Sequence, residues 1–94
     1  MLNLSIRSKL KSLVRETIRS GDIVNIVISK DDNENDARLE IRVVYDSKSK
    51  KIDPSEVAGI TTKARKILLE SNEENFPVFY FIHKSEAGSL IAAE

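Results

Sequence analysis

Apolar residues recur with the period of an α-helix near the start of the chain. The residues that share this helix face are Ile6, Leu10, Leu13, Val14 and Thr17. Spacings of three and four residues place such positions on one side of a helix. Gly21 follows the segment, and a glycine commonly stands just past the end of a helix. The pattern therefore predicts a helix over residues 4–20.

Two segments with strand character follow this helix. Residues 23–29 are rich in β-branched side chains and too few for a typical helix, which predicts a strand. Residues 38–45 alternate between apolar and polar positions, the pattern of a strand with one buried face and one wet face. The polar run 31–36 between them is rich in turn-forming residues. We therefore expect the two strands to form a hairpin.

A second helix is predicted by the sharpest local signal in the chain. Asp53 occupies the N-cap position, Pro54 the first helical position, and Glu56 the capping-box position three residues after the cap. An apolar stripe follows at helical spacing and consists of Val57, Ile60, Ala64, Ile67 and Leu68. The pattern predicts a helix to about residue 70. Gly59 lies inside it, which indicates either close approach by a partner or a loosened first turn.

The remaining segments complete an α+β fold. Residues 76–83 predict a third strand, and residues 85–94 a flexible or weakly helical tail. The order α-β-β-α-β predicts one domain over residues 1–84, a two-layer α/β sandwich with a three-stranded mixed sheet and two helices on one face. A right-handed crossover makes the second and third strands parallel. The first strand is apolar at nearly every position, so we expect it to be central.

Composition excludes several classes of chemistry. The 94 residues include no cysteine, which excludes disulfides, thiolate metal sites and cysteine nucleophiles. Fifteen basic side chains balance fifteen acidic ones, so broad charge-driven binding of nucleic acid is not expected. No long apolar run or secretory signal is present, and we expect a cytoplasmic protein without a membrane span.

The acidic run between the first two strands has a partial likeness to a calcium-binding loop. Asp31, Asn33 and Asn35 occupy ligand positions of that pattern. Asp36 stands where the sharp turn requires glycine, and Arg42 stands where a bidentate glutamate is needed. A solvated hairpin loop is therefore the better interpretation.

His83 is the one imidazole in the chain, and the sequence implies no serine or cysteine partner for it. We expect a surface or rim position for it at a strand end. The three glycines, at positions 21, 59 and 88, are too far apart to form a phosphate-binding loop. With no nucleophile–base pair in view, we expect no enzymatic activity, no metal, no cofactor and no small-molecule substrate.

A basic stripe runs along the first predicted helix. Arg7, Lys11, Arg15 and Arg19 recur every four residues. Residues 1–20 carry five positive charges and one negative, a net of +4, whereas residues 21–40 carry two positive and six negative, a net of −4. The stripe is consistent with a solvated helix face, a phosphate-backbone contact, an anionic membrane surface, or the acidic loop of a second copy.

The uncovered face of the sheet is the strongest candidate for a functional surface. We expect an apolar patch on this face with a charged rim, as at protein interfaces. The apolar members are expected to be Ile23, Val27, Phe79 and Phe81, and the rim Arg38, Glu40 and Arg42. The alternative is that Leu90 and Ile91 in the tail fold back over this face.

These features predict a small non-enzymatic interaction module that forms a homodimer through the open sheet face. The alternative is an RNA-binding module that uses the basic stripe. An adaptor or inhibitor that binds another protein fits the same residues. The element order is shared with several small modules, among them the KH-like domain of ribosome-maturation factors. The Gly-x-x-Gly segment with which a KH domain clamps nucleotides is missing from this chain, and we assign no family.

Overall fold

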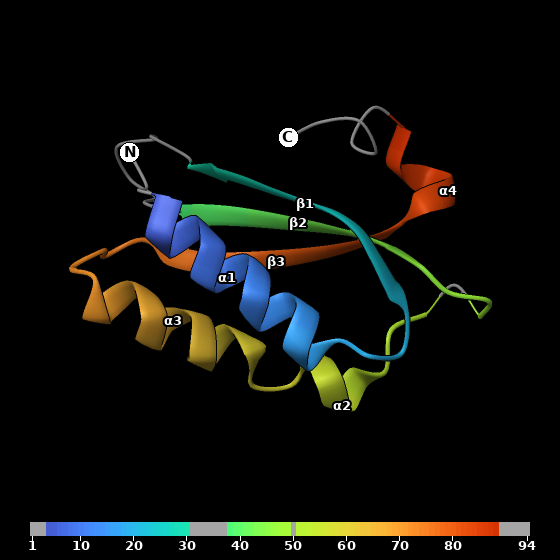
Figure 1. Ribbon diagram of the computed structural model, residues 1–94, viewed down its shortest axis with the longest axis horizontal. Helices are drawn as coiled ribbons and strands as arrows, with labels where there is room; N and C mark the ends of the chain where they lie inside the picture. Colours follow the sequence, from blue (N-terminus) through green and yellow to red (C-terminus); the bar gives the residue numbers. More distant parts are fainter. Residues whose placement is uncertain (1–3, 31–37, 50, 89–94) are drawn as a thin grey trace.

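The computed structural model describes residues 4–30, 38–49 and 51–88. The elements are α1 (Leu4–Thr17), β1 (Asp22–Lys30), β2 (Arg38–Asp46), α2 (Pro54–Val57), α3 (Ile60–Glu70), β3 (Phe76–His83) and α4 (Lys84–Ala87). They form a three-stranded mixed sheet with helices packed against it, so the expected α+β class is confirmed (Figure 1). None of the helices in the described ranges combines the length and the apolar character that crossing a membrane requires.

β2 is the central strand, and the strand order is β1-β2-β3. β1 pairs antiparallel with β2, as the hairpin predicts, and β3 pairs parallel with β2, as the crossover predicts. The expectation that β1 is central is wrong. Side chains point to the faces of a sheet, whereas the backbone of any strand carries hydrogen-bonding groups on both edges, so apolar content does not identify the central strand. Alternation therefore described the faces of β2 and said nothing about its edges.

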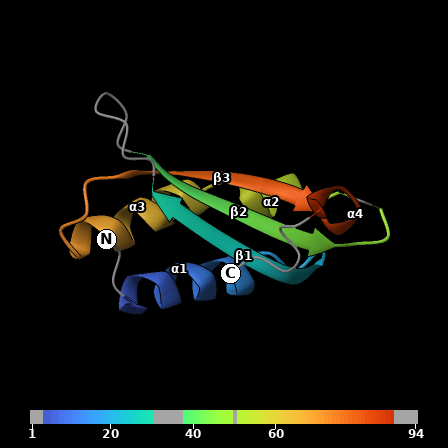
Figure 2. The same cartoon turned by 90° about the horizontal axis from the view of Figure 1, so that it is seen from above.

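The helices α1, α2 and α3 cover one face of the sheet, and α4 lies on the opposite side at one end (Figures 1 and 2). The core between the helices and the sheet is aliphatic. Its buried members are Ile6, Leu10, Val14, Ile18, Ile26, Ile28, Leu39, Ile41, Val43, Ile60, Ala64 and Leu68. Both predicted helix stripes supply this core, which is the two-layer arrangement expected from the sequence.

The end of α1 differs from the prediction. The helix ends at Thr17, three residues before the expected boundary, so Gly21 does not act as its terminating glycine. A Cβ atom on Gly21 would lie 3.0 Å from the carbonyl oxygen of Asp46 and 3.3 Å from the Cβ of Ser47. Glycine at this position therefore permits close packing of the chain entering β1 against the end of β2.

The second predicted helix is two helices. Asp53 caps α2 as expected, because its Oδ1 atom accepts a hydrogen bond of 3.0 Å from the backbone N–H of Ser55. The helix stops after Val57, and Gly59 takes a left-handed backbone conformation with φ of +83° before α3 begins. The prediction of one continuous helix across Gly59 is thus wrong. Glycine adopts this conformation with little steric cost, which lets the chain change direction between α2 and α3.

A β-bulge decides which side chains of β1 face the helices. Ile23 is opposite Tyr45 and Asn25 is opposite Val44, so Val24 is the extra residue. The bulge brings Ile23 onto the same face as Ile26 and Ile28, where it packs against the core. Its expected place on the open face is therefore wrong, because strict alternation along β1 is broken at one residue.

The aromatic residues of β3 also face the helices. Phe79 is opposite Ile41 and Phe81 is opposite Val43 in the parallel register, and both rings pack against the core. Their expected place on the open face is wrong. β3 carries apolar side chains on both faces, so its own alternation could not choose between them.

α4 is a single helical turn that covers one end of the open face. Ala87 is buried, and Val44, which points to the side opposite Val43, is fully buried at this end of the sheet. The rest of the predicted tail, including Leu90 and Ile91, lies outside the described residues.

Candidate functional site

The open face is defined by the strand positions that alternate with those of the core. Its members are Asn25, Val27 and Ser29 on β1, Arg38, Glu40, Arg42 and Val44 on β2, and Val78, Tyr80 and Ile82 on β3. Val27 and the predicted rim residues are thus on the expected side. The apolar contribution of β3 comes from Val78, Tyr80 and Ile82 in place of the two core phenylalanines.

A pair of opposite charges stands in the middle of the open face. The Nη2 atom of Arg42 lies 2.8 Å from Oε1 of Glu40, two residues away on the central strand. The Nη1 atom of Arg42 donates to Oγ of Ser29 at 3.2 Å, and the guanidinium lies 5.4 Å from the ring centroid of Tyr80. These contacts from all three strands hold the guanidinium in one orientation. The pair is therefore a preorganised polar centre flanked by Val27 and Val78.

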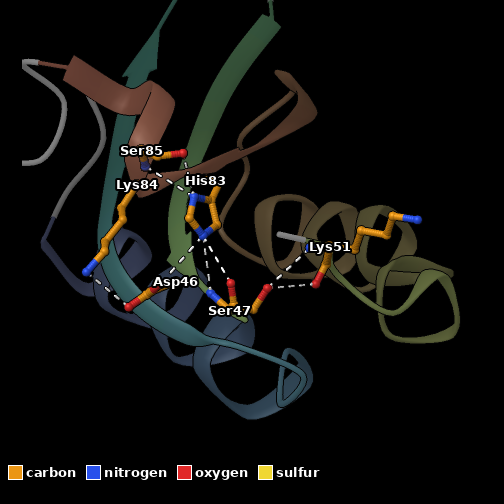
Figure 3. A network of polar contacts seen from close by, with 6 residues as sticks. All are labelled: Asp46, Ser47, Lys51, His83, Lys84 and Ser85. Atoms are coloured by element: carbon orange, nitrogen blue, oxygen red, sulfur yellow. Dashed lines mark hydrogen bonds and ion pairs between the residues drawn. The ribbon is translucent and has the colours of Figure 1, made fainter. Parts of the chain in front are cut away.

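His83 lies in a second polar cluster, at the junction of β3 and α4 (Figure 3). Its Nδ1 atom is 2.8 Å from Oγ of Ser85 and accepts the backbone N–H of the same residue at 3.2 Å. The Nε2 atom is 3.2 Å from the carbonyl oxygen of Ser47 and 3.5 Å from Oδ1 of Asp46. With Nδ1 accepting, the proton of a neutral ring belongs on Nε2, where it is donated to Ser47.

The surface position expected for His83 is wrong. The side chain is 9% exposed and packs edge-on against the ring of Tyr45 at a centroid distance of 5.4 Å. Ser85 and Asp46 both contact the ring, although the sequence analysis assigned neither of them to it. The sequence offered one signal for this contact, the two-residue spacing of His83 and Ser85 where a strand meets a helix. A side-chain acceptor at an N-cap accepts a hydrogen bond from the backbone N–H two or three residues later.

Contacts among a serine, a histidine and a carboxylate also occur in catalytic sites with a serine nucleophile. Here the Nδ1 atom of His83 is shared between the hydroxyl and the backbone N–H of Ser85, which is the geometry of a helix cap. Asp46 is engaged by the ammonium group of Lys84 at 3.1 Å. Two hollows on the described surface, one beside α1 and one on α3, are lined by other residues. The cluster therefore caps α4 and joins it to the end of β2.

A groove of about 600 Å³ lies between α1 and β1. We call it the basic groove, and its lining residues are Leu4, Arg7, Ser8, Lys11, Ser12, Arg15 and Ile26. Three of the four residues of the predicted basic stripe line it. Arg19 does not, because it lies beyond the end of α1 and its Nε atom donates to the carbonyl oxygen of Glu16 at 3.3 Å. The structure thus turns most of the stripe into one wall of a concave surface.

The acidic run that has a partial likeness to a calcium loop, with Asp31, Asn33, Asn35 and Asp36, lies outside the described residues. Elsewhere, among the residues that the structure describes, histidine, aspartate and glutamate side chains form no group of three or more suited to a metal ion.

Comparison of the chain with protein-family models, with curated proteins and with solved structures finds no match. We therefore infer function from the chemistry of the open face and the basic groove.

Proposed function

We propose that the protein is a non-enzymatic interaction module that forms a homodimer through the open face of its sheet. The observation that carries this proposal is the pairing of Glu40 with Arg42 at the centre of that face. A two-fold interface brings the same patch of both copies together. A patch with one acid and one base near its centre is complementary to itself, because Arg42 of one copy meets Glu40 of the other.

The side chains around the charged pair support the same arrangement. Tyr80 is 38% exposed, and Val27, Val78 and Ile82 are partly exposed on the same face. Burial of apolar surface contributes about 25 cal/mol for each Å² removed from water. The central charges then fix the orientation of the two sheets, since like charges oppose each other in any other register.

The organisation of the His83 cluster supports a role without catalysis. Ser85 donates to the ring as part of a helix cap, and its neighbours satisfy the remaining polar groups. The cluster holds α4 at one end of the open face and so bounds the surface available to a second copy.

The dimer is tested by reversing the central charges. Light scattering after size exclusion should give twice the mass of the 10.6 kDa chain. Arg42→Glu leaves two acids at each centre and Glu40→Arg leaves two bases, so each variant alone should become monomeric through like-charge repulsion. The matched control is Lys63→Glu, an equal charge reversal on the exposed side of α3, which should remain dimeric.

Mixing the two variants separates contacts between copies from contacts within one copy. In an equimolar mixture each acidic centre can face a basic centre, so dimer mass should return. The pair within each chain stays broken in the mixture, and its loss cannot explain such a recovery. A wild-type monomer, or a mixture that stays monomeric, overturns the proposal.

A further inference from the structure

We propose that the basic groove binds an extended acidic peptide, which pairs its backbone with the free edge of β1. This inference concerns a surface separate from the open face and does not depend on the homodimer. The open face lies on one side of the sheet, whereas the basic groove lies along the edge of β1 on the side of α1.

The backbone of β1 favours an extended peptide as the partner. Among the described strands β1 pairs with β2 alone, so its outer edge carries no third strand. The N–H of Ile26 is bonded by the side-chain oxygen of Asn25 at 2.9 Å, and the carbonyl of Ile28 accepts from Nη1 of Arg7 at 3.4 Å. Both groups therefore point away from β2. An extended peptide can replace these local side-chain contacts with a regular ladder of backbone hydrogen bonds.

The charge and spacing of the residues on the helical wall of the groove favour acidic side chains in the peptide. Arg7, Lys11 and Arg15 stand four residues apart on the helical wall of the groove, which separates them by about 6 Å along the axis. Side chains on one face of a strand repeat at about 6.7 Å. Alternating carboxylates of an extended peptide therefore match the three basic residues in turn. The groove-lining residues include no acid that would oppose such a peptide.

The lining of the groove favours a peptide over single-stranded RNA, the alternative partner for the basic stripe. Groove-lining residues include no aromatic ring on which a base could stack. They do include Leu4, which is 84% exposed and offers aliphatic contact to peptide side chains. A strand edge also forms a regular ladder of hydrogen bonds with a peptide backbone, which a nucleotide cannot form.

The probe is a fluorescein-labelled peptide of alternating glutamate and valine, titrated with the protein while fluorescence anisotropy is recorded. Saturable binding is expected. A peptide with lysine in place of glutamate should not bind. A version with alternate amides N-methylated should bind about tenfold more weakly, because it cannot form the ladder. Oligouridylate is titrated in parallel.

Two charge reversals on one helix test the site. Arg15→Glu should weaken peptide binding by about tenfold or more, because an acid replaces a groove cation. Lys9→Glu makes the same change of net charge outside the groove, and its effect should stay within about twofold. Hydrogen exchange at the amides of Ile28 and Lys30 should slow when the peptide binds.

The proposal is overturned if the peptide does not bind, if both variants weaken it equally, if N-methylation has no effect, or if oligouridylate binds in its place. The homodimer is followed separately by light scattering, which Arg15→Glu should leave unchanged. Failure of the peptide and failure of the dimer are therefore distinguishable.

Discussion

The hydroxyl of Ser20 lies 2.6 Å from the carboxylate of Glu56, 36 residues further along the chain. The same Oε1 atom of Glu56 also accepts the backbone N–H of Ser20 at 3.0 Å, while Oγ of Ser20 accepts the N–H of Asp53 at 3.0 Å. In a capping box, the glutamate itself bonds the N–H of the cap residue. Here Ser20 takes over that bond and joins the segment after α1 to the start of α2.

Stability should fall as the medium is acidified below about pH 5. The hydrogen bond from Ser20 lowers the pKa of Glu56, and the backbone N–H of Ser55 lowers the pKa of Asp53. A carboxyl with a lowered folded-state pKa stabilises the protein above its unfolded pKa, near 4 for these groups. That contribution is lost as the pH falls through the folded-state value. Thermal melts from pH 7 to pH 3 measure the effect.

The Ser20→Ala variant provides the matched comparison for these melts. It removes the side-chain hydrogen bond that contributes most to the lowered pKa of Glu56. The variant should melt at a lower temperature at pH 7 and lose less stability on acidification. Parallel curves for the variant and the wild type would contradict the role given to Ser20.

Gly59→Ala should destabilise the protein by about 1 kcal/mol, because an alanine strains the left-handed backbone at this position. If Gly59 lay within a continuous helix, the same change would stabilise it by a similar amount. Gly59→Asn should cost less than Gly59→Ala, since asparagine tolerates this conformation better. Urea unfolding gives the sign and the order of the two effects.

Phe81→Glu and Tyr80→Glu should have opposite consequences although the two residues are adjacent. Phe81 packs against the core, so a carboxylate there should cost about 3 kcal/mol or more. Tyr80 is on the open face, and the same charge should leave the fold intact. Urea unfolding measures the loss of stability in Phe81→Glu. Light scattering measures the molecular mass of the folded Tyr80→Glu variant. A folded Phe81→Glu protein of unchanged stability would contradict the assigned faces.

His83→Ala should destabilise the protein by about 2 kcal/mol, because it removes the cap of α4 and leaves polar groups of Ser47 and Ser85 without this partner. His83→Asn should recover part of the loss, since asparagine is a good N-cap. Urea unfolding compares the variants. Nitrogen chemical shifts of the wild-type ring should show the proton on Nε2, and a proton on Nδ1 would contradict the cap.

Local periodicity predicted most elements correctly, because each hydrophobic pattern identifies the buried face of the helix or strand in which it occurs. The stripe of Ile60, Ala64 and Leu68 predicted the buried face of α3, and Asp53 predicted the start of α2. Both depend on neighbours within a few residues. The break at Gly59 was missed because glycine is compatible with a helix interior and with a left-handed turn, and packing of the flanking helices selects between them.

Candidate sites were harder to predict because they join residues that are distant in sequence. Nothing near Arg42 in the chain indicates that Ser29 and Tyr80 hold its guanidinium. The basic stripe was visible as a repeat of four, but its place beside β1, an edge strand among the described strands, depends on the order of the strands. His83 offered a short-range signal in Ser85, whereas its contact with Asp46 depends on the parallel register of β2 and β3.

The amino-acid sequence by itself determined the kind and order of the elements, since hydrophobic period and capping act within a few residues. Tertiary structure decided the strand order, the bulge at Val24 and the face on which Phe79 and Phe81 lie. The physical reason is the period of two along a strand. A strand with apolar side chains on both sides can present either to the helices, and a shift of one residue exchanges them. Packing against α1 and α3 across the whole sheet makes that choice.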